Sequence, residues 1–130
     1  GNYYMNEFSA AIGLSQLKKL DKLNKKRKNI AKRYFNEIII NEKMPLSTDC
    51  VYHLYWIKVK NRKQFIDEMN RKGIETGIHY KPIHKMTAYK NKIYLPVTEK
   101  ISKEIVSIPM HPNLTEKNID YIIKTINDII

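Results

Sequence analysis

The chain opens with a proline-free run from Asn6 to about Ile40, and this run limits the fold more than any other feature of the sequence. Asn6 is a good helix N-cap, and Glu7 is favourable beside the positive end of a helix. Apolar residues of the first three turns point in most directions around a helix, whereas those of the later turns gather on one side. The run predicts one long helix whose beginning needs neighbours on several sides.

Three later segments carry the alternation of apolar and polar residues that is typical of β-strands. In the first of them His53 falls on the apolar face, where we expect a hydrogen-bonded core histidine. Pro109 in the last cannot donate a ladder hydrogen bond, which predicts an edge or end position. The three predicted strands are residues 51–60, 74–80 and 106–110.

Helix signals lie between these strands and after them. Asn61 can cap a helix that ends at Gly73, Pro96 fits the first turn of another, and Thr115 can cap the last. The predicted fold class is α/β, of the two-layer α+β kind, with about three strands covered by helices. We expect one domain over residues 1–130, with the long helix at 1–40 and an α/β sandwich at 51–130.

The composition indicates a soluble intracellular protein. A chain of 130 residues can bury a real core, and its single cysteine, Cys50, excludes an internal disulfide. The amino terminus lacks a signal-peptide pattern, and no apolar run approaches the roughly 18 residues of a membrane span. We expect a cytoplasmic location and no membrane partner. Because Gly1 stands where a complete protein has its initiator methionine, the sequence reads as a piece of a larger protein.

The candidate site is the stretch from Gly73 to Tyr89, which reads GIETGIHYKPIHKMTAY. A helix-ending glycine, a short predicted strand and a loop marked by proline follow one another there. The rings of this stretch combine apolar bodies with hydrogen-bonding tips, which suits them to hold a polar ligand. The predicted substrate-binding residues are His79, Tyr80, His84 and Tyr89.

Other kinds of site find little support in the sequence. Four histidines raise the question of a metal, but no carboxylate or thiol stands at ligand spacing beside them, and no metal site is predicted. No serine lies in a glycine-flanked elbow, and no glycine-rich phosphate loop is present. We therefore predict no catalytic residue in this chain.

The net charge of +11 leaves a second class of function open. A cationic surface neutralises phosphates, so a freestanding nucleic-acid-binding module is the main alternative, and a scaffolding domain without catalysis is another. The basic residues of the long helix spread over a broad arc, and no recognition-helix or RNA-binding motif accompanies them. Nucleic acid is thus not the expected partner.

Several ordered blocks give the chain a resemblance to a known family. The blocks are NYYMNE at 2–7, AAIGL at 10–14 with QL at 16–17, HLY at 53–55, the stretch 73–89, and SIPMHP with LT at 107–115. Together they resemble the carboxyl-terminal small domain of the DegT/DnrJ/StrS group of sugar aminotransferases, which use pyridoxal phosphate (PLP) and have the type I fold of PLP-dependent transferases.

The resemblance implies an enzyme that converts a keto group on a nucleotide-linked sugar to an amine, with glutamate as donor, in the biosynthesis of amino sugars or cell-surface polysaccharides. In this family the Schiff-base lysine lies in a large upstream domain. No residue here matches it, so this chain alone is not expected to be active or to bind PLP tightly. Asn2 matches the asparagine that reaches the PLP phosphate of the neighbouring subunit, which implies a homodimer.

The same resemblance places His79 and Tyr80 beside the sugar-nucleotide pocket, with His84 and Tyr89 flanking it. Two positions depart from the family pattern. Tyr4 stands where a basic residue is common, and Thr87 where a proline is common.

Overall fold

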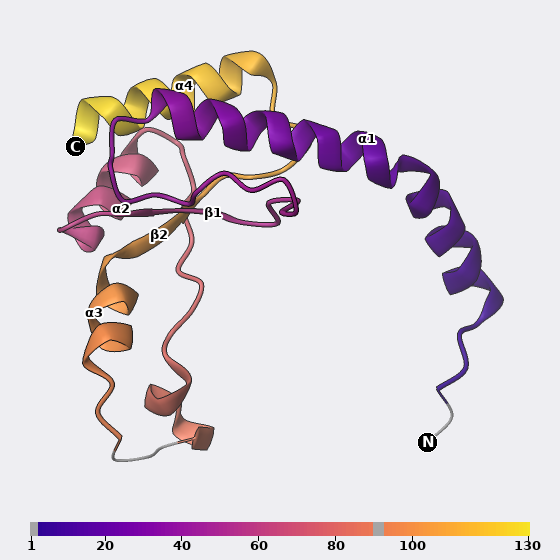
Figure 1. Cartoon of the computed structure of the whole chain (residues 1–130), viewed down its shortest axis with the longest axis horizontal. Helices are drawn as coiled ribbons and strands as arrows, with labels where there is room; N and C mark the ends of the chain where they lie inside the picture. The colour runs from indigo at the N-terminus through magenta and orange to yellow at the C-terminus, as the bar shows by residue number, and fades with distance from the viewer. Residues whose placement is uncertain (1–2, 90–92) are drawn as a thin grey trace.

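In the computed structural model, which describes residues 3–89 and 93–130, the long helix is the dominant element (Figure 1). Helix α1 (Glu7–Glu37) begins directly after Asn6, whose side-chain oxygen accepts a hydrogen bond from the Ser9 amide at 2.8 Å. It ends slightly before the predicted Ile40, because Ile38 already has an extended backbone. The predicted N-cap and the predicted long helix are both confirmed.

The sheet is smaller than the sequence predicted. Strands β1 (Tyr55–Lys58) and β2 (Ile105–Ile108) pair antiparallel, with Tyr55 opposite Ile108. Two isolated β-bridges add to this sheet. Lys43 pairs with Ile57 of β1, and Gly77 pairs with Ser107 of β2. The fold class is confirmed, since a long helix precedes a small mixed α/β body, but the described residues form two strands in place of about three.

The prediction that His53 is a core histidine is wrong. Tyr52 has a positive φ of 54°, so the extended conformation begins only at Tyr55 and the alternation predicted for 51–60 is broken. Tyr52 turns into the core instead, where its hydroxyl donates to the Ser47 carbonyl at 3.1 Å. His53 is left exposed to solvent.

The predicted strand at 74–80 is reduced to one bridge. Gly77 exchanges two backbone hydrogen bonds with Ser107, at 2.9 and 2.8 Å. Beyond Gly77 the chain turns so that the His79 ring lies against the glycine, at a place where a Cβ would overlap that ring. Ladder pairing therefore stops there.

The helix signals of the sequence are confirmed. Helix α2 (Arg62–Arg71) is capped by Asn61 and is followed by Gly73 at a φ of 73°. Helix α3 (Pro96–Glu104) has its proline in the first turn and runs directly into β2. Helix α4 (Glu116–Ile129) starts with a capping box in which Thr115 and Asn118 bond each other's backbone amides. The caps of α2 and α4 satisfy amides that a helix leaves unpaired, and the proline of α3 has no amide hydrogen to satisfy.

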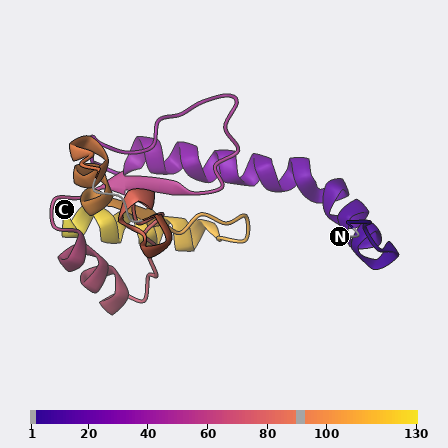
Figure 2. The same ribbon diagram turned by 90° about the horizontal axis from the view of Figure 1, so that it is seen from below.

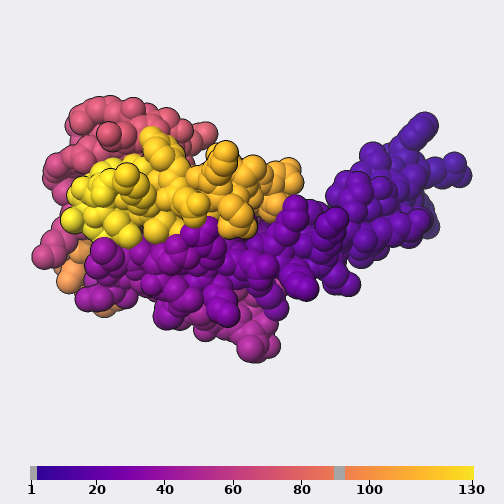
Figure 3. All heavy atoms as spheres, turned by 90° about the horizontal axis from the view of Figure 1, so that it is seen from above, coloured from indigo at the N-terminus to yellow at the C-terminus, as the bar shows by residue number. Residues whose placement is uncertain are grey.

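The core lies between the sheet and the helices, and α1 and α4 run side by side over it (Figures 1 and 3). The later turns of α1, both strands, α2 and α4 all contribute to one apolar cluster. Burying each large aliphatic side chain stabilises the fold by roughly 1.5–3 kcal/mol. Its largest fully buried members are Tyr34, Ile38, Tyr52, Tyr55, Ile57, Met69, Val106, Ile119 and Ile126.

Two parts project from this body. The N-terminal half of α1 extends beyond it (Figures 2 and 3), and its apolar residues are open to solvent, with Phe8 85% and Leu17 64% exposed. The second projection consists of residues 80–89 and 93–104, which we call the arm. One limb of the arm holds the 3-10 helices η1 (Ile83–Lys85) and η2 (Thr87–Tyr89), and the other holds α3.

The described ranges include no helix that combines the length and the apolar character needed to cross a bilayer.

Candidate functional site

An open groove of about 630 Å³ lies between the segment 73–79, the end of β2 and the start of α4. The end of β2 and the start of α4 form two of its walls, and the chain from Ser107 to Thr115 connects these two elements. Its polar lining includes Glu75, Thr76, His79 and His111, while Leu54 and Leu114 supply apolar surface. The groove therefore offers hydrogen-bonding groups on a partly apolar floor, which is the usual composition of a small-molecule site.

Among the described residues, two polar atoms of groove-lining side chains are buried without a hydrogen-bond partner. They are the hydroxyl oxygen of Thr76 and Nδ1 of His79. Leaving such an atom unpaired costs about 1–3 kcal/mol, so buried polar groups are normally satisfied. Both residues also line the groove, so this end of it carries hydrogen-bonding groups that the described fold leaves unused.

Tyr80 continues directly from His79, and the two rings meet edge to face with their centroids 4.8 Å apart. His79 is half-buried, whereas Tyr80 is 68% exposed. The pair joins the groove to the base of the arm. A ligand that spans both would meet an imidazole and a phenol in fixed relative orientation, which suits stacking together with hydrogen bonding.

His84 lies in the arm, and its side chain is almost fully enclosed at 8% exposure. Its Nε2 lies 3.2 Å from Oε1 of Glu99 in α3, and the Lys85 ammonium reaches the same oxygen at 3.2 Å. The Leu95 amide donates to Oε1 as well, at 3.4 Å. Partial burial raises the pKa of Glu99, but these hydrogen bonds together outweigh burial and hold the pKa of the carboxyl below its ordinary value.

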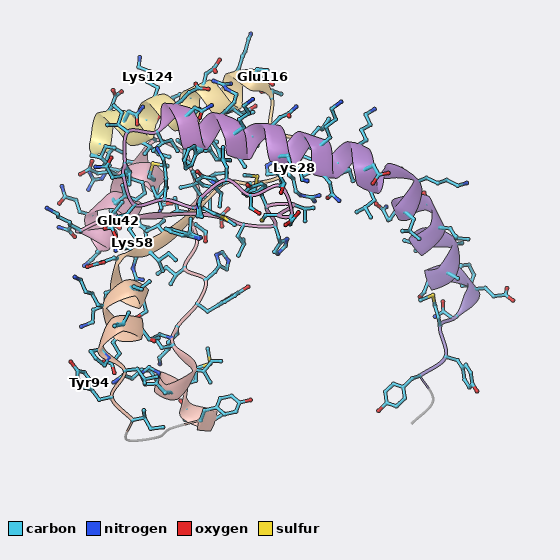
Figure 4. All side chains as sticks on the ribbon, in the orientation of Figure 1. Lys28, Glu42, Lys58, Tyr94, Glu116 and Lys124 are labelled. Carbon is cyan, nitrogen blue, oxygen red and sulfur yellow. The ribbon has the colours of Figure 1, made fainter. Side chains whose placement is uncertain are left out.

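Tyr89 is 61% exposed at the end of η2, and Tyr94 is 75% exposed on the other limb, at the end of the arm (Figure 4). The structure thus brings His79 and Tyr80 together, while His84 and Tyr89 stand farther along the arm. Asn2, predicted to reach a cofactor phosphate, lies outside the described residues. The substrate-binding roles of the four ring residues stay predictions.

The groove by itself does not fit PLP. That cofactor needs a lysine for its Schiff base and donors or cations for its phosphate. Among the described residues that line the groove there is no lysine or arginine, and Glu75 adds a negative charge. In the same described part of the chain, no three side chains of His, Cys, Asp or Glu come together as a metal site would require.

Comparison with known families assigns the chain. A family model described as the DegT/DnrJ/EryC1/StrS aminotransferase family matches residues 1–127. The chain belongs to this family. The resemblance seen in the ordered sequence blocks is thereby confirmed.

Solved structures of family members share the fold. The sugar aminotransferase CalS13 from Micromonospora echinospora superposes with a TM-score of 0.89 at 25% identity, over 98% of this chain and 36% of that protein. PseC from Helicobacter pylori, an aminotransferase involved in the biosynthesis of pseudoaminic acid, superposes with a TM-score of 0.88 at 28% identity. The match covers 99% of this chain and 38% of PseC. A DegT/DnrJ/EryC1/StrS aminotransferase from Brucella abortus superposes with a TM-score of 0.79 at 33% identity. The match covers 92% of this chain and 34% of that protein.

The chain therefore spans little more than a third of the length of these family members. One relative, Spr1654 from Streptococcus pneumoniae, has been solved in a PLP form, with a TM-score of 0.87 at 29% identity. Most of each relative thus consists of residues with no counterpart among these 130.

Sequence reasoning missed Glu99 and the lining of the groove. Glu99 is an acidic residue in the first turn of α3, which by itself indicates only a favourable helix end. Its contact with His84 spans 15 residues of sequence, so no local pattern could reveal it. Thr76 and His111 fall inside the sequence blocks 73–89 and SIPMHP, but no local pattern showed that the two blocks line one groove, where the Gly77–Ser107 bridge joins them.

Proposed function

We propose that this family member supplies the small-domain wall of the substrate pocket in a PLP-dependent aminotransferase that acts on a nucleotide-linked keto-sugar, with glutamate as the amino donor. The observation that carries this proposal is the family match over residues 1–127 together with the position of residues 77–80, the GIHY segment, beside a groove. The parent enzyme would be cytoplasmic and would serve amino-sugar or surface-polysaccharide synthesis.

The described residues are suited to binding and orientation. The side chains of His79 and Thr76 line the groove with hydrogen-bonding groups, and the exposed rings of Tyr80 and Tyr89 can pack on flat or apolar faces of the ligand. Glu75 and the absence of cations in the described lining disfavour an anion in the groove itself. The groove end would therefore receive the sugar, and phosphates would lie elsewhere.

The cofactor belongs to the part of the parent enzyme that these residues do not match. PLP supplies the electron sink of transamination when it is bound there. In this proposal Asn2 would reach the PLP phosphate of the neighbouring subunit in a homodimer. None of the lysines in this chain is assigned a catalytic role.

The exposed surfaces of the molecule support this division. The apolar start of α1 and the aromatic arm are unusually open for a protein of this size, with Phe8 85% and Tyr94 75% exposed. In Figure 1 the start of α1 extends to the right of the body and bends downward, and the arm extends below the body. The remaining two-thirds of a family member would cover them.

Reaction with PLP tests the absence of a catalytic lysine. The protein would be mixed with PLP, reduced with borohydride, and mapped by mass spectrometry. We expect scattered, substoichiometric modification of surface lysines and no aminotransfer from glutamate. A single lysine that is modified stoichiometrically, together with turnover, would contradict the proposal.

A second candidate function rests on the cationic surface of α1. Seven lysines of its middle turns are exposed, and they give that part of the helix a strongly positive face. Titration with a random oligonucleotide at several salt concentrations separates the two functions. Tight binding with a steep salt dependence would favour a nucleic-acid module, and weak binding favours the aminotransferase assignment. The lysines are Lys18, Lys19, Lys22, Lys25, Lys26, Lys28 and Lys32.

A further inference from the structure

The two limbs of the arm meet at one carboxylate. His84 Nε2 and Lys85 Nζ, both from η1, approach Oε1 of Glu99 at 3.2 Å, and the Leu95 amide approaches it from the start of α3 at 3.4 Å. In the part of the chain that the structure describes, no other side-chain hydrogen bond or ion pair joins the limbs. Glu99 therefore accepts all the side-chain polar contacts that join the described limbs of the arm.

This contact differs from an ordinary surface ion pair. The side chains of His84 and Glu99 are 8% and 18% exposed, whereas Glu116, an ion-pair partner of Arg33, is 80% exposed. Exposed pairs contribute little because water competes for both partners. Several donors share one enclosed oxygen of Glu99, so removing this carboxylate removes all of these contacts at once. We therefore expect the two limbs to separate cooperatively.

The same geometry changes the role expected for His84. An ionised carboxylate only accepts hydrogen bonds, so the His84 ring must carry its proton on Nε2 and donate it to Glu99. With this nitrogen occupied and the side chain enclosed, His84 cannot present Nε2 to a ligand. Its ring is used to hold the arm.

We propose that Glu99 is a positioning residue for the substrate wall, and that His84 acts through Glu99 and not by touching the substrate. Tyr80 and Tyr89 precede and follow η1 on the limb that Glu99 holds, so the carboxylate fixes where these two rings stand. The part of this inference that concerns the substrate rests on the proposed function, whereas the role of Glu99 in closing the arm does not.

Amide hydrogen exchange tests the closure of the arm. The Lys85, Met86 and Tyr89 amides donate to Pro82, Ile83 and Met86 carbonyls within the first limb. Glu99→Ala should accelerate their exchange on the order of tenfold, because hydrogen bonds to a charged group are lost. The Ser107 amide in the sheet should be unaffected. Unchanged exchange in the arm would overturn the proposal.

Two further variants keep this test decisive. Glu99→Gln retains an acceptor oxygen, so it should restore much of the protection, and it carries the comparison if Glu99→Ala does not fold. Glu104→Ala is the matched control, since Glu104 lies on the same helix and pairs with Lys58 of β1 at 3.4 Å. If Glu104→Ala accelerated the arm amides as much as Glu99→Ala, the specific role of Glu99 would be refuted.

Ring nitrogen spectra of His84 give a readout that general destabilisation would not move. The wild-type protein should show the tautomer with the proton on Nε2, and Glu99→Ala should lose this preference while the His111 spectrum stays the same. A wild-type His84 protonated on Nδ1 alone would overturn the assignment.

Titration with UDP-glucose then separates this inference from the proposed function. Weaker binding in Glu99→Ala than in the wild type, with an opened arm, supports the positioning role. Equal binding despite an opened arm refutes that role and leaves the site assignment standing. If the wild type itself did not bind UDP-glucose or dTDP-glucose, the proposed function would fail, and the exchange data would still decide whether Glu99 closes the arm.

Discussion

At the scale of single residues, buried tyrosine hydroxyls organise the core. Tyr34 is fully buried, and its hydroxyl donates to the Pro109 carbonyl at 2.8 Å, which ties α1 to the segment that follows β2. Burial raises the pKa of the Tyr34 phenol well above its ordinary value, so the hydroxyl stays a donor at all physiological pH values. Tyr55 meets Tyr34 edge to face with ring centroids 5.3 Å apart.

Replacing Tyr34 by phenylalanine removes the donor to the Pro109 carbonyl at a partly buried position. We expect Tyr34→Phe to lower the free energy of unfolding by about 1–2 kcal/mol. Urea denaturation measures this change. Tyr121→Phe is the control, because its hydroxyl bonds the Lys72 carbonyl at an exposed position and should cost little. If the two variants lowered the free energy of unfolding equally, the role given to Tyr34 would be contradicted.

Gly77 and Gly13 provide a second pair of residues. A Cβ at Gly77 would overlap the His79 ring, whereas one at Gly13 would meet no atom within 4 Å. Gly77→Ala should displace the His79 ring and destabilise the protein by about 1–3 kcal/mol, as overpacking does. Gly13→Ala should be neutral or stabilising, because alanine favours helix. Urea denaturation and the His79 ring resonances test this, and a wild-type His79 spectrum in Gly77→Ala would refute it.

The residue scale also shows where sequence reasoning failed. Alternation placed His53 inside and left Tyr52 on the other face, but one positive φ at Tyr52 reversed them. A non-glycine residue with positive φ has no reliable sequence signal. The sequence indicated the ring residues of 73–89 as candidate binding residues. It could not indicate which residues they contact, because the contact between His84 and Glu99 depends on how the arm folds back.

At the scale of elements, Arg33 links α1 to α4. Its guanidinium donates to Glu37 of the same helix and to Glu116 and Asp120 of α4, at distances between 2.7 and 3.0 Å. Glu116 lies at the start of α4, beside α1 (Figure 4). The hydrogen bond from Arg33 is the largest influence on Glu37 and lowers the pKa of this carboxyl.

This ion-pair group predicts a defined pH dependence. The folded-state pKa of Glu37 is depressed, so its contribution to stability is complete above the unfolded-state pKa and is lost as the pH falls through the folded-state value. Because these side chains are partly exposed, we expect Arg33→Met to cost only about 0.5–1 kcal/mol at pH 7. Urea denaturation at pH 7 and pH 3 should show this difference shrinking in acid. A difference that stayed constant or grew would contradict the account.

Elements were predicted well where a local signal specified them. Asn6, Asn61, Pro96 and Thr115 each began the helix expected of them, because capping is decided within a few residues. Strand lengths were overestimated, because pairing requires a partner at the right distance. Residues 74–80 alternate as a strand does, yet only Gly77 reaches Ser107.

At the scale of the whole molecule, the start of α1 and the residues before it expose several large apolar side chains. Tyr3, Met5, Phe8, Ile12 and Leu17 are between 63% and 96% exposed. Surfaces of this kind associate when no partner covers them. The apolar side chains of the first three turns thus point in several directions, as the sequence indicated, and the described residues leave them exposed to solvent.

Sedimentation velocity tests this consequence. We expect the protein to self-associate with rising concentration, and the double variant Phe8→Asp with Leu17→Asp to be mainly monomeric. Val51→Asp, at an exposed apolar position outside α1, should behave as the wild type does. A wild-type protein that remained monomeric at high concentration would contradict the prediction.

We propose that the GIHY segment and the arm form one wall of a sugar-nucleotide pocket. A titration of the isotope-labelled protein with UDP-glucose and dTDP-glucose, followed through the backbone amide resonances, tests this proposal. We expect weak, saturable shifts concentrated in residues 74–89 and around His111, with the lysine-rich turns of α1 unaffected. Shifts confined to those lysine-rich turns, or no saturable shift at 74–89, would contradict it.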